Sequence, residues 1–260
     1  EESGARCFHR PHALRSLCHA VSSLEALFFD IDDTLCATTA FAQVARRNAV
    51  HAMIAAGLRA DEAALYRELE DVIAEFSSNY EHHFDKLLLR LDPRALEHLN
   101  PALVVAAGVA AYHDTKFREL APFPGVIELL RDLRAAGLKV GIITHGLTVK
   151  QAEKLVRLGL VPHLDPEAIF ISDQMGVAKP NPKIYAMALR GVGVAAERAM
   201  YVGDNPKNDV DPAHRLGMIT CWARLVQRHT LGQETPHHTI EHFGELRALL
   251  RANYGVSIPG

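Results

Sequence analysis

The sequence lacks a long hydrophobic run, a cysteine framework and an excess of charge of one sign. No apolar stretch reaches about 18 residues, the length that a membrane-spanning helix needs, so no such helix is predicted. The four cysteines, Cys7, Cys18, Cys36 and Cys221, form no C-x-x-C pair and show no framework spacing. This scatter predicts a reducing, cytoplasmic setting.

Charge and composition favour a globular protein that handles a small ligand. The 28 Lys and Arg residues against 31 Asp and Glu residues give a formal net charge of −3, which argues against a nucleic-acid surface. Hydrophobic residues make up 48% of the 260 residues, so a substantial core is available. A chain of this length can form one large domain or a domain with an insert.

The first 23 residues differ in composition from the rest. They contain Arg, His and Ser but no acidic residue after Glu2. This composition resembles a transit-like leader, and the segment has no apolar core of the kind that a secretory signal contains. We therefore expect residues 1–23 to form an N-terminal extension outside the fold.

A hydrophobic run that ends in paired acids is the most informative motif. Residues 24–35 read LEALFFDIDDTL, which places Asp30 and Asp32 at the end of a predicted buried strand. Ligands of open α/β sheets collect beyond the carboxyl ends of such strands. Alternation along an extended chain predicts that Asp30 and Asp32 face one side while Asp33 points away, and two facing carboxylates call for a cation. The plainer interpretation is a strand end followed by an acidic helix cap.

Between residues 37 and 120 the apolar residues recur three and four positions apart, which is the spacing of helix faces. Polar or proline-containing breaks divide this region, as at Ser77-Ser78-Asn79 and Asp92-Pro93. The pattern predicts a bundle of about four helices inserted after the first strand.

After the Pro- and Gly-rich segment 121–125, short apolar strands alternate with helices. Such alternation predicts right-handed crossovers and a doubly wound α/β fold, with a parallel sheet covered on both faces. We expect further strands at 138–144, 169–172, 199–202, 219–222 and 238–240, and helices at 126–136, 148–158, 182–190, 210–216 and 243–252.

Three more polar clusters lie in loops just after predicted strands. Thr144-His145-Gly146 offers a hydroxyl and backbone N–H groups that suit an oxyanion. Lys179 lies in the loop GVAKPNP, and Asp204 and Asp209 lie five apart in YVGDNPKND. Taken alone, a threonine at a strand end is usually a cap and a loop lysine is most often a solvated charge. Acids in a loop of Gly, Asn and Pro are common turn chemistry. Together the clusters place acids, a hydroxyl and a lysine at one edge of the predicted sheet.

These four clusters, in this order, resemble the signature of the haloacid dehalogenase superfamily of phosphohydrolases, whose D-x-D-x-T motif is present as Asp30, Asp32 and Thr34. The similarity covers residues 24–252. It implies a Rossmann-like α/β core at 24–36 and 121–254, with a type I helical cap domain at 37–120. By pattern the chain is most similar to small-molecule phosphatases of subgroup IA, which also holds phosphoglycolate and acylneuraminate phosphatases.

The resemblance implies a role for each acid. Asp30 is expected to attack phosphorus and form an aspartyl-phosphate. Asp32 is expected to protonate the departing alcohol and later to take a proton from the attacking water. An oxygen-rich ligand set suits Mg²⁺ better than Zn²⁺. The implied Mg²⁺ ligands are Asp30, the backbone carbonyl of Asp32, Asp204 and Asp209.

The remaining motif residues are expected to hold the phosphoryl oxygens, since positioning and electrostatics are most of what phosphoryl transfer requires. Thr144 and Lys179 count as catalytic as well. The implied partner is a small phosphorylated metabolite, with no nucleic acid and no membrane, and the chain is expected to be a monomer or a homodimer. The expected phosphate-binding positions are Thr34, Thr144, His145, Gly146 and Lys179.

Substrate choice is expected to lie with the cap, which must close over the phosphate site. Polar residues that interrupt or flank the apolar stripes are the candidates for reading the substrate, although each is also typical of a solvated helix face. These candidates are Asn79, His82, His83, Lys116 and Arg118.

Three alternatives stay open at this point. Haloacid dehalogenases of the same fold lack an aspartate at the position of Asp32, because their leaving group needs no proton, so its presence favours phosphate esters. A phosphomutase keeps both acids and would make a sugar bisphosphate instead of free phosphate. A non-catalytic binding protein would have lost Asp30, Asp32, Lys179 or Asp204, and all four are present.

Overall fold

The computed structural model describes residues 23–226 and 229–259, so the expected extension at 1–23 lies, except for Ser23, outside the described residues. Its centre is a six-stranded sheet with the strand order β3-β2-β1-β4-β5-β6, and every pair of neighbours is parallel. This sheet confirms the predicted doubly wound α/β class. The strands are β1 (Ala26–Phe29), β2 (Lys139–Thr144), β3 (Ile169–Ile171), β4 (Ala199–Gly203), β5 (Ile219–Ala223) and β6 (His238–Ile240).

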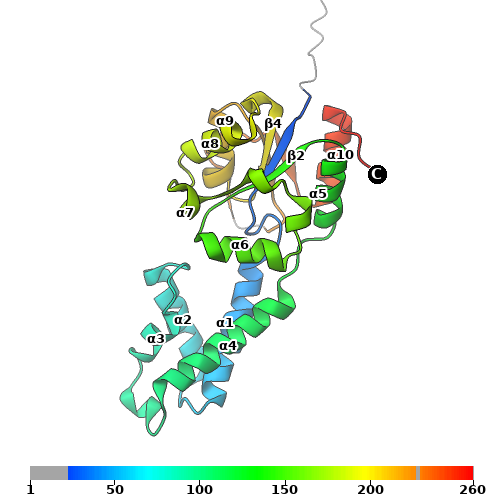
Figure 1. Ribbon diagram of the computed structural model, residues 1–260. Coiled ribbons are helices and arrows are strands. Elements are labelled where there is room, and N and C mark those ends of the chain that lie inside the picture. Colours follow the sequence, from blue (N-terminus) through cyan, green and yellow to red (C-terminus); the bar gives the residue numbers. More distant parts are fainter. Residues whose placement is uncertain (1–22, 227–228, 260) are drawn as a thin grey trace, which may run out of the picture.

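Helices cover both faces of this sheet (Figure 1). Because side chains alternate along a strand, Leu27 and Phe29 of β1 enter one hydrophobic cluster, whereas Ala26 and Phe28 enter the other. The first cluster is completed by α5 (Val126–Ala135), α6 (Thr148–Arg157) and α10 (Phe243–Tyr254), and the second by α8 (Lys183–Val192) and α9 (Asp211–Arg215).

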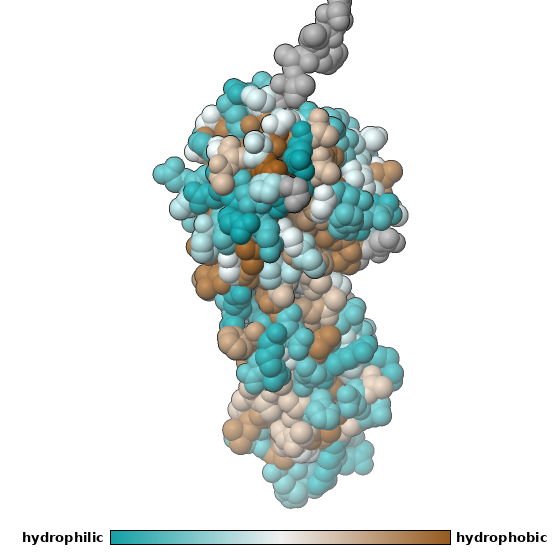
Figure 2. All heavy atoms as spheres, turned by 90° about the vertical axis from the view of Figure 1, so that its right-hand side faces the viewer, coloured by the Kyte–Doolittle hydropathy of each residue, from teal (hydrophilic) through white to brown (hydrophobic). Residues whose placement is uncertain are grey.

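Four helices lie between β1 and α5 and form a separate, smaller body beside the sheet (Figure 1). We call residues 38–119 the helical insert. It has its own hydrophobic cluster, which includes Val50, Leu69, Leu87 and Val104. Figure 2 shows the two bodies as a broad upper part and a narrower lower part, with polar and apolar side chains mixed on the face in view. The helices are α1 (Thr38–Ala55), α2 (Glu62–Phe76), α3 (His83–Leu88) and α4 (Pro101–Glu119).

Local sequence signals explain where the helices of the insert begin. The Asp61 carboxylate accepts from the backbone N–H of Ala64 at the start of α2, and the Asn100 side chain accepts from Ala102 at the start of α4. Gly108 of α4 leaves room for Met53 of α1, since a Cβ at this glycine would lie 2.9 Å from the Met53 Cγ. The absence of that Cβ lets α1 and α4 pack closely.

The elements differ from the expected ranges mainly at their ends. One helix, α7 (Ser172–Met175), was not expected, because four residues are too few to show a periodic pattern. A π-helical turn, Pro206–Val210, precedes α9 and lies almost entirely before the helix expected at 210–216. Among the described residues no helix has the length and hydropathy needed to cross a membrane.

Candidate functional site

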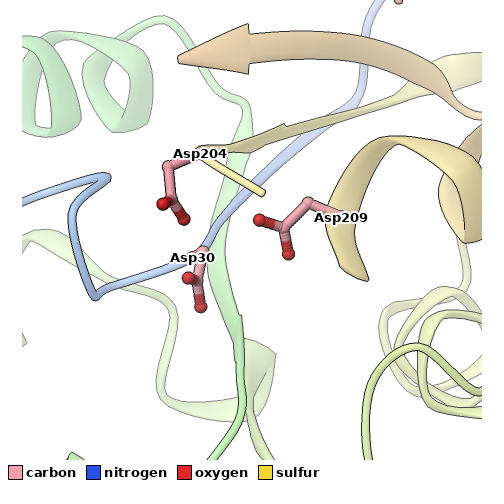
Figure 3. Close-up of side chains that lie close together, drawn as sticks. All are labelled: Asp30, Asp204 and Asp209. Atoms are coloured by element: carbon pink, nitrogen blue, oxygen red, sulfur yellow. The ribbon is translucent and has the colours of Figure 1, made fainter. Parts of the chain in front are cut away.

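Three carboxylates meet at the carboxyl edge of the sheet. Asp30 follows β1, Asp204 follows β4, and Asp209 lies in the π-helical turn. One oxygen from each carboxylate lies within 4.8 Å of the others, and all three side chains are buried. Figure 3 shows the three carboxylate groups facing one another. β1 and β4 are neighbours in the sheet, which is why residues so distant in sequence come together.

Lys179 joins this cluster from the loop before α8. Its Nζ lies 2.8 Å from an oxygen of Asp30 and 2.7 Å from an oxygen of Asp209. It also donates a hydrogen bond to the Tyr201 hydroxyl, which donates in turn to the backbone carbonyl of Ile143. Burial alone would lower the pKa of Lys179, but the two carboxylates outweigh it and hold the pKa well above its usual value. Lys179 is therefore a fixed positive charge.

The remaining negative charge in the cluster exceeds what one lysine balances. Burial raises the pKa of Asp30 to about 6, against the opposing effect of Lys179. Burial, together with the charges of Asp209 and Asp30, raises the pKa of Asp204 to about 8. Buried carboxylates repel one another in this way unless a cation lies between them. The hard oxygen donors and the excess negative charge fit a divalent cation such as Mg²⁺.

The carboxylate positions are fixed by their surroundings. The Trp222 indole N–H donates to the backbone carbonyl of Asp204 over 2.8 Å. The Asp209 carboxylate accepts from the backbone N–H of Asn205 over 2.9 Å. Gly203 comes so close to Asp209 that an added Cβ would lie 2.4 Å from its carboxylate. These contacts hold the two acids in place before any ligand binds.

Asp32 faces the same cavity but has different partners. Its carboxylate accepts from the Thr38 hydroxyl over 2.6 Å and from the Gln151 side chain over 3.2 Å, and it lies 2.5 Å from the Lys154 Nζ. Burial raises the pKa of Asp32, but the Lys154 charge and these hydrogen bonds outweigh it and lower the pKa below its usual value. Its side chain thus stands apart from the cluster of Asp30, Asp204 and Asp209.

The prediction that Asp33 points away from the site was wrong. Strand β1 ends at Phe29, and Asp33 adopts a positive φ of 54°, so the alternation of an extended strand does not continue to this residue. Asp33 lines the cavity together with Asp30 and Asp32. Its carboxylate accepts from the backbone N–H and the hydroxyl of Thr39 in the first turn of α1.

The expected phosphate-binding positions fall into two groups. His145 and Lys179 line the cavity, and burial with the charge of Lys179 lowers the pKa of His145. Thr34, Thr144 and Gly146 are buried and do not line it. Among the described residues the hydroxyls of Thr34 and Thr144 have no hydrogen-bond partner, whereas the Gly146 N–H donates to the Ser172 hydroxyl. A buried hydroxyl without a partner in the protein can be satisfied by a ligand.

The cavity above the cluster has a volume of about 810 Å³ and is lined by both bodies of the molecule. Of the five candidates for reading the substrate, Asn79, His83 and Lys116 line it, and His82 and Arg118 do not. Contacts from α6 cross between the bodies. Lys150 donates to the backbone carbonyl of Asn79, and Glu153 pairs with Lys116.

Sequence reasoning missed several residues of the site. Gln151 and Lys154 belong to an amphipathic helix, α6, whose contact with Asp32 depends on how the helix packs. Tyr201 lies within a hydrophobic strand, and nothing in the strand distinguishes it from a core residue. His229, whose Nε2 lies 3.4 Å from Asp204, follows β5 in a polar loop. The only sequence feature that could have marked His229 as a site residue is that its loop follows a strand.

Comparisons with known proteins show the family of this chain. The family model of haloacid dehalogenase-like hydrolases matches residues 24–217. A glyceraldehyde 3-phosphate phosphatase of Methanopyrus kandleri is 51% identical over 205 residues, covering 77% of this chain and 84% of the relative. A protein of the same name from Pyrococcus abyssi is 47% identical over 199 residues, covering 76% and 81%.

Solved structures share the fold. The crystal structure of a HAD phosphatase from Thermococcus onnurineus covers 87% of this chain and 98% of its own, with a TM-score of 0.64 and 24% identity. The family model spans most of the described sheet and the whole helical insert, and it includes Asp30, Lys179 and both acids that follow β4. The chain therefore belongs to the family of haloacid dehalogenase-like hydrolases.

Proposed function

We propose that this protein is a Mg²⁺-dependent phosphatase whose substrate is glyceraldehyde 3-phosphate or another phosphate monoester of similar size. The conclusion that the protein is a phosphatase of small phosphate monoesters is supported by the phosphatases to which it is similar over most of its length. The observation that carries the proposed mechanism is the buried cluster of Asp30, Asp204 and Asp209 around Lys179. The name of the relatives supports the choice of substrate.

In this proposal Asp30 is the nucleophile. One of its oxygens lies beside Lys179, and the carboxylate points to the centre of the cluster (Figure 3). A bound Mg²⁺, held by Asp30, Asp204, Asp209 and the backbone carbonyl of Asp32, would neutralise charge on the phosphoryl group. Lys179 holds the phosphoryl oxygens as a second positive charge. Attack of the Asp30 oxygen on phosphorus then breaks the bond to the alcohol and gives an aspartyl-phosphate.

Asp32 serves as the acid and base of the two steps. It donates a proton to the departing alcohol, and it takes a proton from the water that attacks the aspartyl-phosphate. Water attack releases inorganic phosphate and restores Asp30. Thr34, Thr144, His145 and Gly146 are proposed to support the phosphoryl oxygens.

The helical insert is proposed to act as the cap domain, residues 37–120, over a core of residues 24–36 and 121–254. The insert supplies one side of the cavity, and contacts from α6, among them Lys150 with the Asn79 carbonyl and Glu153 with Lys116, hold it there. A cap in this position excludes water from the phosphoryl group during transfer.

Phosphate release from a panel of esters tests the proposal. The panel contains glyceraldehyde 3-phosphate, 3-phosphoglycerate, phosphoglycolate and p-nitrophenyl phosphate, each with Mg²⁺ and with EDTA. The proposal expects Mg²⁺-dependent release with glyceraldehyde 3-phosphate among the best substrates. Release that persists fully in EDTA would contradict the metal, and release confined to the other esters would contradict the substrate.

A further inference from the structure

Arg46 is the one lysine or arginine of the cavity wall that has no ion-pair or hydrogen-bond partner among the described residues. The four lysines that line the same cavity are all paired: Lys116 with Glu153, Lys150 with Glu81, Lys154 with Asp32, and Lys179 with Asp30 and Asp209. Arg46 is half-buried on α1 and lines the cavity from the insert. A guanidinium has five N–H donors and no acceptor, so it calls for oxygen acceptors.

The position of Arg46 relative to the cluster follows from the helix. Thr39, Ala42, Gln43 and Arg46 all line the cavity, and their spacing of three and four places them on one face of α1. Arg46 lies eight residues beyond Thr38, which is about 12 Å along the helix axis. Helical side chains generally lean toward the N-terminus of the helix, which for Arg46 is the end where Thr38 contacts Asp32.

Tyr112 of α4 also lines the cavity. Burial raises the pKa of Tyr112, and the charges of both Arg46 and Lys154 oppose that rise. Tyr112 lines the same cavity as Arg46 and as Lys154, the lysine that contacts Asp32. Ala42, which has a small side chain, lines the cavity one turn before Arg46 on α1.

We propose that Arg46 is a specificity-determining residue that binds oxygen acceptors at the end of the substrate farthest from the phosphate. This inference rests on the proposed function and deepens it. The preferred substrates are short phosphate monoesters with an aldehyde or carboxylate oxygen at that end. Arg46 does not strengthen the binding of esters that lack such an oxygen.

A truncation that keeps the bulk of the side chain, Arg46→Met, tests the proposal. Wild type and variant are compared on glyceraldehyde 3-phosphate, on 3-phosphoglycerate, and on propyl phosphate, which has the same chain length without the other oxygens. Propyl phosphate is followed as a substrate, or as a competitive inhibitor if its turnover is slow. The matched control is Arg47→Met, because Arg47 is exposed and lies over the Tyr66 ring, 5.4 Å from its centroid, outside the cavity wall.

The proposal expects Arg46→Met to lower kcat/KM about 10-fold for glyceraldehyde 3-phosphate and about 100-fold for 3-phosphoglycerate, since hydrogen bonds to a charged acceptor are stronger. The loss should come mainly from KM, as expected when a binding contact is removed. Values for propyl phosphate should stay within about 2-fold, as should all values for Arg47→Met.

Two results would overturn the inference. An equal loss of kcat/KM on all three esters would show that Arg46 supports the structure or the binding of the phosphoryl group. An unchanged kcat/KM on both oxygen-bearing esters would show that Arg46 does not bind the far end of the substrate. In both cases an active wild type would leave the proposed function standing. Wild type that releases phosphate from no ester would instead refute the proposed function, and this inference with it.

Discussion

Asp32 has three side-chain partners in the structure, and none of them belongs to the carboxylate cluster. Lys154 and these hydrogen bonds lower the pKa of Asp32, whereas burial raises the pKa of Asp30, so the two carboxyls have different proton affinities, as their different roles require. The Lys154 ion pair stabilises the carboxylate form, which is the form that accepts a proton from water in the second step.

Replacing Asp32 by Asn should separate substrates by their leaving groups. An alkyl alcohol needs a proton as it departs and p-nitrophenolate does not, so kcat/KM should fall about 100-fold or more for glyceraldehyde 3-phosphate and far less for p-nitrophenyl phosphate. The ratio kcat/KM is the appropriate measure, because it reports the steps up to transfer of the phosphoryl group. Equal losses on the two esters would remove Asp32 from the role of acid.

The carboxylate cluster also predicts how Mg²⁺ affects stability. A ligand that binds only the folded chain raises the unfolding temperature, by roughly 5–10 °C at about 100 times its Kd for a protein of this size. Replacing Asp204 by Asn removes one proposed ligand, so most of the rise should disappear. The control Asp114→Asn changes an exposed acid of α4 and should keep it. A rise of the same size in Asp204→Asn, measured by thermal unfolding with Mg²⁺ and with EDTA, would contradict the proposed metal site.

At the scale of elements, α10 is tied to α5 by an ion pair. The Arg247 Nη1 lies 2.7 Å from a carboxylate oxygen of Asp132, and both side chains are mostly buried. The hydrogen bond from Arg247 is the largest cause that lowers the pKa of Asp132, and a hydrogen bond from Arg131 adds to it. A carboxyl with a lowered pKa in the folded state stabilises that state above its unfolded pKa of about 4, and the effect is lost as the pH falls through the folded value.

Arg247→Gln should therefore cost about 1 kcal/mol of unfolding free energy at pH 7 and less near pH 2.5, because the contribution of the ion pair is lost as the pH falls through the folded pKa of Asp132. Urea unfolding at the two pH values measures this difference. Arg251→Gln, an exposed arginine on the same helix, is the control and should change little at either pH. A cost for Arg247→Gln that does not depend on pH would show that its contribution is packing and not charge.

The elements also show which parts of the structure the sequence predicts well. Strands such as β2 and β4 were located within a residue or two, because their apolar runs are bounded by glycine and polar residues. The packing of α6 against Asp32 was not predictable, since periodicity tells which face of a helix is buried but not which residue lies opposite it. The turn at Asp33 was missed for a related reason, because its positive φ is uncommon for a residue other than glycine.

At the scale of the whole molecule, the candidate site assembles where the order of strands brings distant loops together. Recognising a parallel sheet was enough to place Asp30 and Asp204 at the same edge, and the family resemblance implied that they hold one metal ion. The structure shows that the strands before them are neighbours. The sequence could not predict which residues of the two bodies line the cavity. That arrangement depends on how the helical insert packs against α6, through Lys150 with the Asn79 carbonyl and Glu153 with Lys116.

The most direct test of the account is phosphate release from glyceraldehyde 3-phosphate by wild type and by Asp30→Asn, each with Mg²⁺ and with EDTA. The change from Asp to Asn is nearly isosteric and removes the nucleophilic oxygen, so the variant should keep the unfolding profile of a folded protein. The account predicts release by wild type with Mg²⁺ alone and a loss of at least about 1,000-fold in Asp30→Asn. An Asp30→Asn protein that keeps more than about a tenth of the wild-type rate would contradict the assignment of Asp30 as the nucleophile.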